Sequence, residues 1–219
     1  MKIAKKRLLP AIFTPLLFLL SSCFGVNADI ALNQNGSGTI AVEYHISGSI
    51  DAIGRLDGNE RWNTIPVGRA DFERTLDRLP GMKLLSYSSA NEGKNLVIRA
   101  KMEFESIQGL LAFMDAQGRR SSFTGDGKSG RLAITLNEAR ENQAESLRML
   151  VSNIAESYFV RMSMSFPSEG NLVITNAGGN HPITIPGSES SARGRRVFFS
   201  FPLYEVLYAT EGIAAEFSW

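Results

Sequence analysis

The amino-acid sequence predicts an α+β fold, in which three main amphipathic helices pack on an antiparallel sheet built from hairpins and the C-terminal part is rich in β-strands. Two observations predict this fold. Two strand-like segments followed by a helical apolar pattern occur three times between residues 29 and 158. After Val160 the apolar residues fall in short runs separated by Gly, Pro and Asn, as is typical of strands. Together they indicate helices lying against an antiparallel sheet.

The first unit joins a hairpin to a helix. Apolar and polar residues alternate over 39–46, after a turn rich in Asn and Gly, which predicts a hairpin with one buried face. Residues 48–66 show no sustained period, so we expect a loop there. Residues 69–79 carry apolar side chains at helical spacing and are followed by Pro80 and Gly81, which predicts an amphipathic helix that ends there.

The second and third units repeat this order without detectable sequence identity. The second unit is predicted to comprise strands over 83–89 and 95–102 and a helix over 103–115. The third is predicted to comprise strands over 121–124 and 131–136 and the longest helix, with the apolar stripe Leu147, Leu150, Val151, Ile154 and Tyr158. A capping box at Thr135 to Glu138 is consistent with the start of this helix.

The C-terminal part is predicted to be mainly β. Candidate strands cover residues 161–166, 172–175, 183–185 and 197–201, and a short helix is expected over 202–209. A last strand over 213–219 would tie the C-terminus into the sheet.

The N-terminus has the pattern of a bacterial lipoprotein signal. Basic residues at positions 2–7 precede an apolar run of 13 residues, which leads into Leu20-Ser21-Ser22-Cys23. A lipobox has an aliphatic residue three positions before a cysteine and small residues beside it, and Cys23 is the only cysteine of the chain. We therefore expect cleavage of the signal peptide 1–22, a lipid on Cys23, a short lipidated linker over 23–28 and a single domain over 29–219. The alternative is an ordinary secretory signal in which Cys23 is incidental.

The expected anchor places the protein at a membrane. The apolar run would span roughly 20 Å as a helix, which is short of the roughly 30 Å hydrocarbon core. The acyl chains of a lipidated cysteine, one of them typically a palmitate, would hold the chain at the bilayer without a spanning helix. The expected location is the bacterial cell membrane or the outer membrane, facing the periplasm or the surface. The outer membrane would follow from Phe24 where an enteric sorting rule applies.

The charge of the processed chain argues against nucleic-acid binding. Removal of residues 1–22 would take away four basic and no acidic residues, leaving 197 residues with 19 basic and 22 acidic ones. A chain with this slightly negative balance has no general electrostatic attraction for nucleic acids or anionic lipids. With its one thiol modified, its fold would contain no disulfide and would depend on the apolar core.

No catalytic, cofactor or metal site is predicted. Gly127-Lys128-Ser129 superficially resembles a phosphate-binding loop, but it lies between two predicted strands and does not open a helix, so we interpret it as a hairpin turn. The processed chain has two histidines, His45 and His181, and neither lies in a metal-binding or nucleophile motif. Paired carboxylates of the kind that hydrolyse glycosides remain open, because their separation is spatial.

A cluster of arginines is a candidate contact for lipid phosphates or an acidic partner. Arg193, Arg195 and Arg196 are expected in a loop rich in Ser and Gly. Near an anionic surface each such contact contributes about 1 kcal/mol. The alternative is a solvated loop whose charges protect the following apolar strand from aggregation.

Two segments of the chain show a family resemblance. The segment from Phe166 to Gly179 has a phenylalanine-proline step before a strand and a turn, and a hairpin is predicted from Asp29 to Ile46. The first segment resembles part of the LppM-like lipoprotein family, and the hairpin is similar to that family's opening strands. The resemblance implies a surface-exposed envelope lipoprotein with an α+β domain, for which lipid or glycolipid binding and host interaction have been proposed. In that family a membrane helix follows the domain, whereas none is expected here in the sequence up to Trp219.

Three classes of function follow from these observations. We favour a non-enzymatic envelope lipoprotein that binds a protein partner or an apolar or lipid ligand, through its sheet face or a groove between helices and sheet. The second class is a structural or assembly subunit of an envelope complex, which a large exposed apolar patch would support. The third is a hydrolase, which converging carboxylates would support. The three helical stripes either leave an apolar pocket over the sheet or close into an ordinary core.

Overall fold

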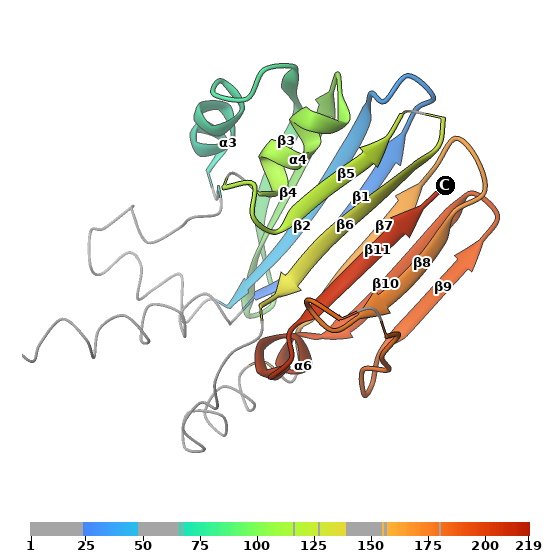
Figure 1. Ribbon diagram of the computed structural model, residues 1–219. Coiled ribbons are helices and arrows are strands. Elements are labelled where there is room, and N and C mark those ends of the chain that lie inside the picture. The colour runs from blue at the N-terminus through green and yellow to red at the C-terminus, as the bar shows by residue number, and fades with distance from the viewer. Residues whose placement is uncertain are drawn as a thin grey trace, which may run out of the picture.

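The described part of the chain is mostly β and forms two sheets (Figure 1). The computed structural model describes residues 24–47, 66, 68–115, 117–126, 128–138, 155, 157–179 and 181–219. Within these ranges it contains eleven strands and three short helices. The predicted arrangement of three main helices on one antiparallel sheet is therefore wrong, because a second sheet lies where the helices were expected.

The larger sheet has seven strands in the order β3-β4-β2-β1-β7-β10-β9. All neighbouring strands in it are antiparallel except β1 and β7, which are parallel. Its strands are β1 (Phe24–Leu32), β2 (Gly38–Ser47), β3 (Met82–Glu92), β4 (Asn95–Phe104), β7 (Phe159–Ser165), β9 (Glu189–Arg193) and β10 (Arg196–Pro202).

The smaller sheet has four strands in the order β5-β6-β11-β8. It combines β5 (Ser121–Gly125) and β6 (Gly130–Asn137) with β8 (Asn171–Thr175) and β11 (Ile213–Ser218). The last strand lies between β6 and β8 and pairs antiparallel with both. The C-terminus is thus tied into a sheet, as predicted.

The two sheets pack face to face over a shared core. Along β1 and β2 the even-numbered apolar residues point into the core, where Ile30 and Ile40 are at most 1% exposed, as expected from strand alternation. From the smaller sheet, Phe217 faces them and lies 6.2 Å from the ring of Phe199 and 6.4 Å from that of Phe166. One continuous cluster of buried residues includes side chains of both sheets, so the sheets stabilise each other.

The helices are short and lie at the margins. Helix α3 (Arg69–Leu76) packs through Phe72, which stacks against Tyr44 at a ring distance of 6.4 Å. Helix α4 (Ile107–Met114) is capped by Ser106, whose hydroxyl accepts a hydrogen bond from the Gly109 N–H at 3.2 Å. Helix α6 (Leu203–Tyr208) follows β10 at the end of the molecule opposite to the C-terminus (Figure 1).

Several predicted elements differ from the structure. Glu103 and Phe104 belong to β4, so the second helix starts at Ile107. Thr135 to Asn137 lie in β6 and form no capping box, because β11 provides their partners. Residues 183–185 form no strand, whereas β9 occupies part of the Ser-rich loop. The expected loop over 48–66 lies outside the described residues except for Pro66, which belongs to no helix or strand. Most of the third helix also lies outside them; Tyr158 is described and is not helical.

Candidate functional site: a groove on the polar face of the large sheet

The two faces of the seven-stranded sheet differ in chemistry. Residues that face the smaller sheet are apolar, whereas their neighbours in each strand, which point to the opposite side, are mostly polar or charged. In β2, for example, Val42 and Tyr44 are buried in the core, and Glu43 and His45 lie on the other face. This face is not covered by the second sheet, so its side chains can meet a ligand.

A groove of about 610 Å³ runs over the polar face. Its walls and floor come from β3, β4, β2, β1, β7 and β10, which are consecutive strands of the large sheet. Among the described residues that line it, those with polar or charged side chains are Asn27, Asp29, Glu43, Ser86, Tyr87, Ser88, Arg99, Lys101, Arg161, Ser163 and Arg196.

The strand register explains why the sheet is hollow here. One row across the sheet contains Lys101, Ala41, Asp29, Ser163 and Phe198, each paired with the next. The small side chains of Ala41 and Ser163 alternate with larger ones and leave room between them. The adjacent row contains Arg99, Glu43, Asn27 and Arg161, also in register. Residues distant in sequence thus converge because four strands align.

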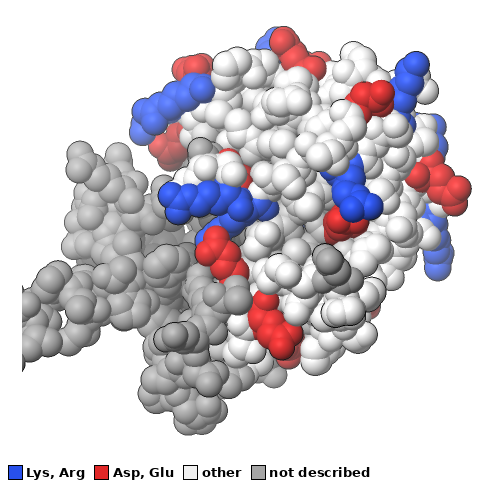
Figure 2. Space-filling model, viewed as in Figure 1, with Lys and Arg blue, Asp and Glu red and all other residues white. Residues whose placement is uncertain are grey.

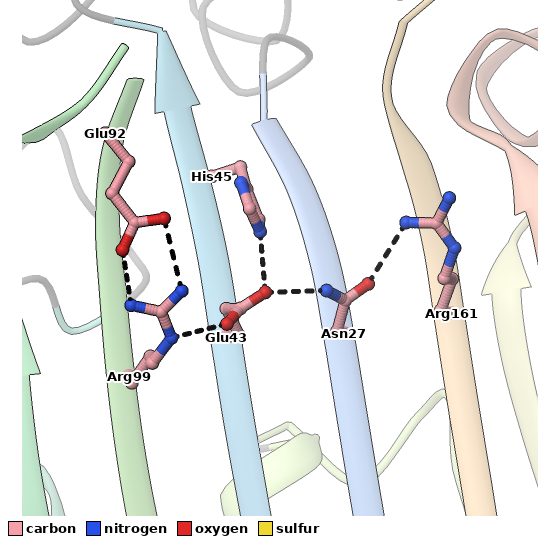
Figure 3. A network of polar contacts seen from close by, with 6 residues as sticks. All are labelled: Asn27, Glu43, His45, Glu92, Arg99 and Arg161. Carbon is pink, nitrogen blue, oxygen red and sulfur yellow. Dashed lines mark hydrogen bonds and ion pairs between the residues drawn. The ribbon is translucent and has the colours of Figure 1, made fainter. Parts of the chain in front are cut away.

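This second row is a continuous polar network (Figure 3). Arg99 donates from Nε to Glu43 Oε2 at 2.6 Å and from Nη1 to Glu92 Oε1 at 2.7 Å. Glu43 Oε1 accepts a hydrogen bond from Asn27 Nδ2 at 3.0 Å and lies 2.7 Å from His45 Nε2. At the far end Arg161 Nη1 lies 3.5 Å from Asn27 Oδ1. Glu43 is therefore the centre of the network.

The network keeps its carboxylates ionised. Partial burial alone would raise the pKa of Glu43, but hydrogen bonds from His45, Arg99 and Asn27 outweigh it and hold that pKa below its usual value. The Arg99 guanidinium lowers the pKa of Glu92 in the same way, and both carboxylates raise the pKa of Arg99. Arg99 therefore forms ion pairs with two carboxylates, those of Glu43 and Glu92.

The other row has a separate ion pair. Arg196 donates from Nη2 to Asp29 Oδ2 at 2.8 Å and from Nε to Ser163 Oγ at 2.9 Å. These contacts hold the Arg196 guanidinium over the groove, beside Phe198.

Positive charge exceeds negative charge in the groove. Its described lining includes four basic side chains, from Arg99, Lys101, Arg161 and Arg196, against two carboxylates, from Asp29 and Glu43. Among the described residues, no carboxylate forms an ion pair with Lys101 or Arg161. The guanidinium of Arg161 instead lies 4.5 Å from the centre of the Phe159 ring. These two cations are the groups that an anion could approach.

The opposite side of the molecule differs. Figure 2 shows the side on which the four-stranded sheet lies, with basic and acidic groups next to one another near its margins. On the outer face of that sheet Arg131 pairs with Glu216 at 3.4 Å. The groove lies on the other side of the large sheet. Figures 1 and 3 both show β4, β2 and β1 from left to right, but β2 runs downward in Figure 1 and upward in Figure 3, so the two figures view opposite faces of this sheet.

The structure separates the three arginines that the sequence placed together. Arg193 ends β9 and is exposed, and Arg195 donates from Nε to the Phe166 carbonyl at 2.8 Å. Only Arg196 lines the groove. Cys23, the expected lipid attachment site, lies outside the described residues, and β1 starts at Phe24, five residues before the expected domain boundary.

The other candidates have structural surroundings that explain them. Lys128 and Ser129 lie between β5 and β6, and their backbone N–H groups donate to Asp126 Oδ1 at 2.8 and 2.9 Å. A carboxylate therefore already occupies the amides that a phosphate would need. His45 lies in β2, and His181 is exposed between β8 and β9.

Most groove residues escaped the sequence analysis. The alternation over 39–46 places Glu43 and His45 on the polar face of a predicted strand, but no sequence pattern singles out Asn27, Asp29, Arg99, Lys101 or Arg161. The signal that could have found them is a charged or amide residue at alternate positions of otherwise apolar strands. That signal becomes specific only when the register is known, because each strand alone resembles an ordinary solvated face.

Neither a metal cluster nor a membrane-spanning helix emerges from the described residues. No three His, Cys, Asp or Glu side chains in these ranges group so that they could hold a metal ion. No helix in the same ranges has the length and apolar character to cross a membrane.

The structural likeness found among known proteins is described for one solved domain, and it is weak. No family model and no curated protein matches the sequence. Among solved structures, the folded domain of the Mycobacterium tuberculosis protein LppM, determined by NMR, is similar with a TM-score of 0.43 and 11% identity, covering 89% of this chain and 88% of that chain. A likeness of this strength carries no information about ligand or activity.

Proposed function

We propose that this chain is a membrane-anchored lipoprotein of a bacterial envelope whose β domain is a non-enzymatic binding module. In this proposal the groove on the large sheet binds an anionic group, such as a phosphate, of an envelope component. The observation that carries it is the surplus of basic side chains in the groove, where Lys101 and Arg161 have no carboxylate partner among the described residues.

The sequence supports the anchored location. The basic and apolar N-terminal segments, followed by Leu20 to Cys23, are typical of a chain that is lipidated on its cysteine. An anchored protein meets the components of its own membrane at high local concentration, which favours a ligand from the envelope.

The shape and charge of the groove favour binding. It is an open trough across several strands, and a phosphate that approached Lys101 or Arg161 would form charge-assisted hydrogen bonds without breaking an existing ion pair. Ser163, Asn27 and Phe198 add hydrogen-bonding and apolar contacts for the neighbouring parts of a ligand. Such a mixture fixes orientation as well as charge.

The same residues argue against a hydrolase. Catalysis by paired carboxylates needs one protonated carboxyl group as general acid, with a raised pKa. Glu43 shows the reverse, because its hydrogen bonds lower its pKa. Asp29, the other carboxylate of the groove, is paired with Arg196. A structural subunit is not favoured either, since Leu85 is the one large hydrophobic side chain that is exposed among the described residues.

A titration with a soluble anionic lipid tests the groove. The full-length protein in detergent is titrated calorimetrically with short-chain phosphatidylglycerol, and with short-chain phosphatidylcholine as the ligand without net charge. We expect saturable binding of the first that weakens at least about tenfold in Lys101→Gln and in Arg161→Gln, since each removes a charged hydrogen bond of about 1.5–3 kcal/mol.

The matched control is Lys83→Gln. Lys83, in β3, has the same charge as Lys101 and Arg161 and lies on the same face of the large sheet, but it does not line the groove. Its replacement should leave the affinity unchanged. Equal weakening in all three variants, or equal binding of both lipids, would show that general surface charge and not the groove is responsible.

A further inference from the structure

We infer that the end of the domain where β1 begins is a membrane-contact surface, formed by Tyr158, Tyr204, Leu207 and Tyr208, that seats the domain on the bilayer carrying its anchor. This inference rests on the proposed lipidation of Cys23. It adds a fixed orientation, in which the groove stands upright with one known end toward the lipid headgroups.

The first observation is that no linker separates Cys23 from the first strand of the sheet. Strand β1 starts at Phe24, the residue directly after Cys23, and pairs from there onward with β2, and from Val26 with β7. Consecutive Cα atoms are about 3.8 Å apart, so a lipid on Cys23 would lie within a few ångströms of the sheet. The end of the sheet that contains Phe24 therefore cannot leave the headgroup region.

The second observation is that α6 lies at this end. Gly25 is packed so closely that a Cβ on it would lie 3.4 Å from the Phe159 carbonyl oxygen and 3.5 Å from Tyr158 Cδ1. The Tyr158 carbonyl in turn accepts a hydrogen bond from the Leu203 N–H at 2.9 Å, and Leu203 begins α6. A chain of direct contacts thus joins the second residue after the cysteine to the helix.

The third observation is the composition of this end. Leu203 and Ala155 form a small buried cluster distinct from the main core, and partly buried apolar and aromatic side chains surround it: Tyr158, Val160, Tyr204, Leu207 and Tyr208. The rings of Tyr204 and Tyr208 lie 5.0 Å apart. Tyrosine has an apolar ring and a polar tip, which is why it is enriched where membrane and water meet.

This orientation sets the height of the groove. Asn27 lies three residues into β1, about 10 Å from Phe24 at the usual rise of a strand. Its neighbour Arg161 is in the same row, so this end of the groove would be at the headgroups. Arg196 pairs with Ser165, which is level with Ala31, about 23 Å from Phe24. The turn with Arg193 and Arg195 would then face away from the membrane.

Fluorescence quenching on vesicles tests the orientation. Cys23 is the only native cysteine, so in the lipidated full-length protein an introduced cysteine is the single free thiol. Thr210→Cys places a bimane label in the exposed turn after α6, and Lys128→Cys places one in the exposed turn between β5 and β6, near the C-terminus. Both proteins are inserted in phosphatidylethanolamine and phosphatidylglycerol vesicles with nitroxide-labelled headgroups.

We expect strong quenching of the label at position 210 and little at 128. Tyr204→Ser combined with Leu207→Ser should reduce the quenching at 210 while the protein stays bound to the vesicles. If Thr210→Cys lowers the yield of folded protein, Glu211→Cys labels the same turn. Equal quenching at both positions, or stronger quenching at 128, in vesicle-bound protein would overturn the orientation alone. An unmodified Cys23 in the intact mass would overturn both the anchor and the orientation.

Discussion

Glu43 shows how one side chain organises the polar face. It accepts hydrogen bonds from Arg99 and Asn27 and pairs with His45, and so joins β4, β2 and β1 through side chains as well as backbone. Because these partners stabilise the ionised carboxylate, its pKa is lowered on folding. The network stabilises the strands that form the groove. Lys101 and the exposed side of Arg161 are then the groups available to the ligand.

We expect Glu43→Gln to lower the free energy of unfolding by about 1–2 kcal/mol at pH 7, since it weakens hydrogen bonds that involve charged groups. Because the pKa of Glu43 is lower in the folded than in the unfolded state, its contribution is fully present above about pH 4.5 and is lost as the pH falls through the folded-state value. Urea unfolding of both proteins between pH 7 and 3 measures this difference.

Glu103→Gln is the control for that comparison. Glu103, in β4, lies on the same face of the large sheet as Glu43, and it forms no ion pair within the described residues. Its replacement should change stability little at any pH. A Glu43→Gln variant whose deficit stayed constant down to pH 3 would mean that the carboxylate is not stabilised by this network.

At the scale of elements, β11 decides the architecture. It inserts between β6 and β8 and so converts a hairpin and a separate strand into a second sheet. Its Phe217 is fully buried and contacts Phe199 of the large sheet and Phe166. The two sheets are therefore held together partly through the last residues of the chain.

We expect Phe217→Ala to lower the free energy of unfolding by about 3–5 kcal/mol, the usual cost of removing a fully buried aromatic ring from a packed core. Glu216→Ala changes the adjacent residue, which points outward and pairs with exposed Arg131, and should cost less than about 1 kcal/mol. Thermal and denaturant unfolding measure both. Similar values for the two variants would contradict the face-to-face packing of the sheets.

The local elements could be predicted from the sequence, whereas their assembly could not. Alternation around a tight turn identified the hairpins β1–β2, β3–β4 and β5–β6, because hairpin pairing is local. The pairing of β1 with β7 joins Asn27 to Arg161, and no local pattern specifies it. The amphipathic stripes predict helices that cover one sheet, but Phe72 and Ile107 fill margins of a core that the second sheet closes.

The candidate site follows the same division. Each groove strand has a polar face that the sequence shows, but convergence of Lys101, Asp29 and Ser163 needs three correct registers at once. The arginine cluster looked like a site because its members are adjacent in sequence. In the hairpin β9–β10 they point to different surroundings, and Arg195 bonds to a backbone carbonyl.

At the scale of the whole molecule, the position of the first strand links anchor and site. Strand β1 lies in the middle of the large sheet, carries Asn27 and Asp29 into the groove, and begins at the residue after Cys23. A lipid on that cysteine would therefore hold the binding surface itself close to the membrane. A freely tethered domain would sample many orientations, whereas this one is expected to sample few.

The intact mass of the protein extracted from bacterial membranes tests this account most directly. We expect a chain that begins at Cys23, without residues 1–22, with a mass increased by a diacylglyceryl group and an N-terminal acyl chain. Cys23→Ala should abolish the added mass and leave the precursor uncleaved. A processed protein with an unmodified Cys23 thiol, or a membrane-bound chain that begins at another residue, would contradict the anchored binding module.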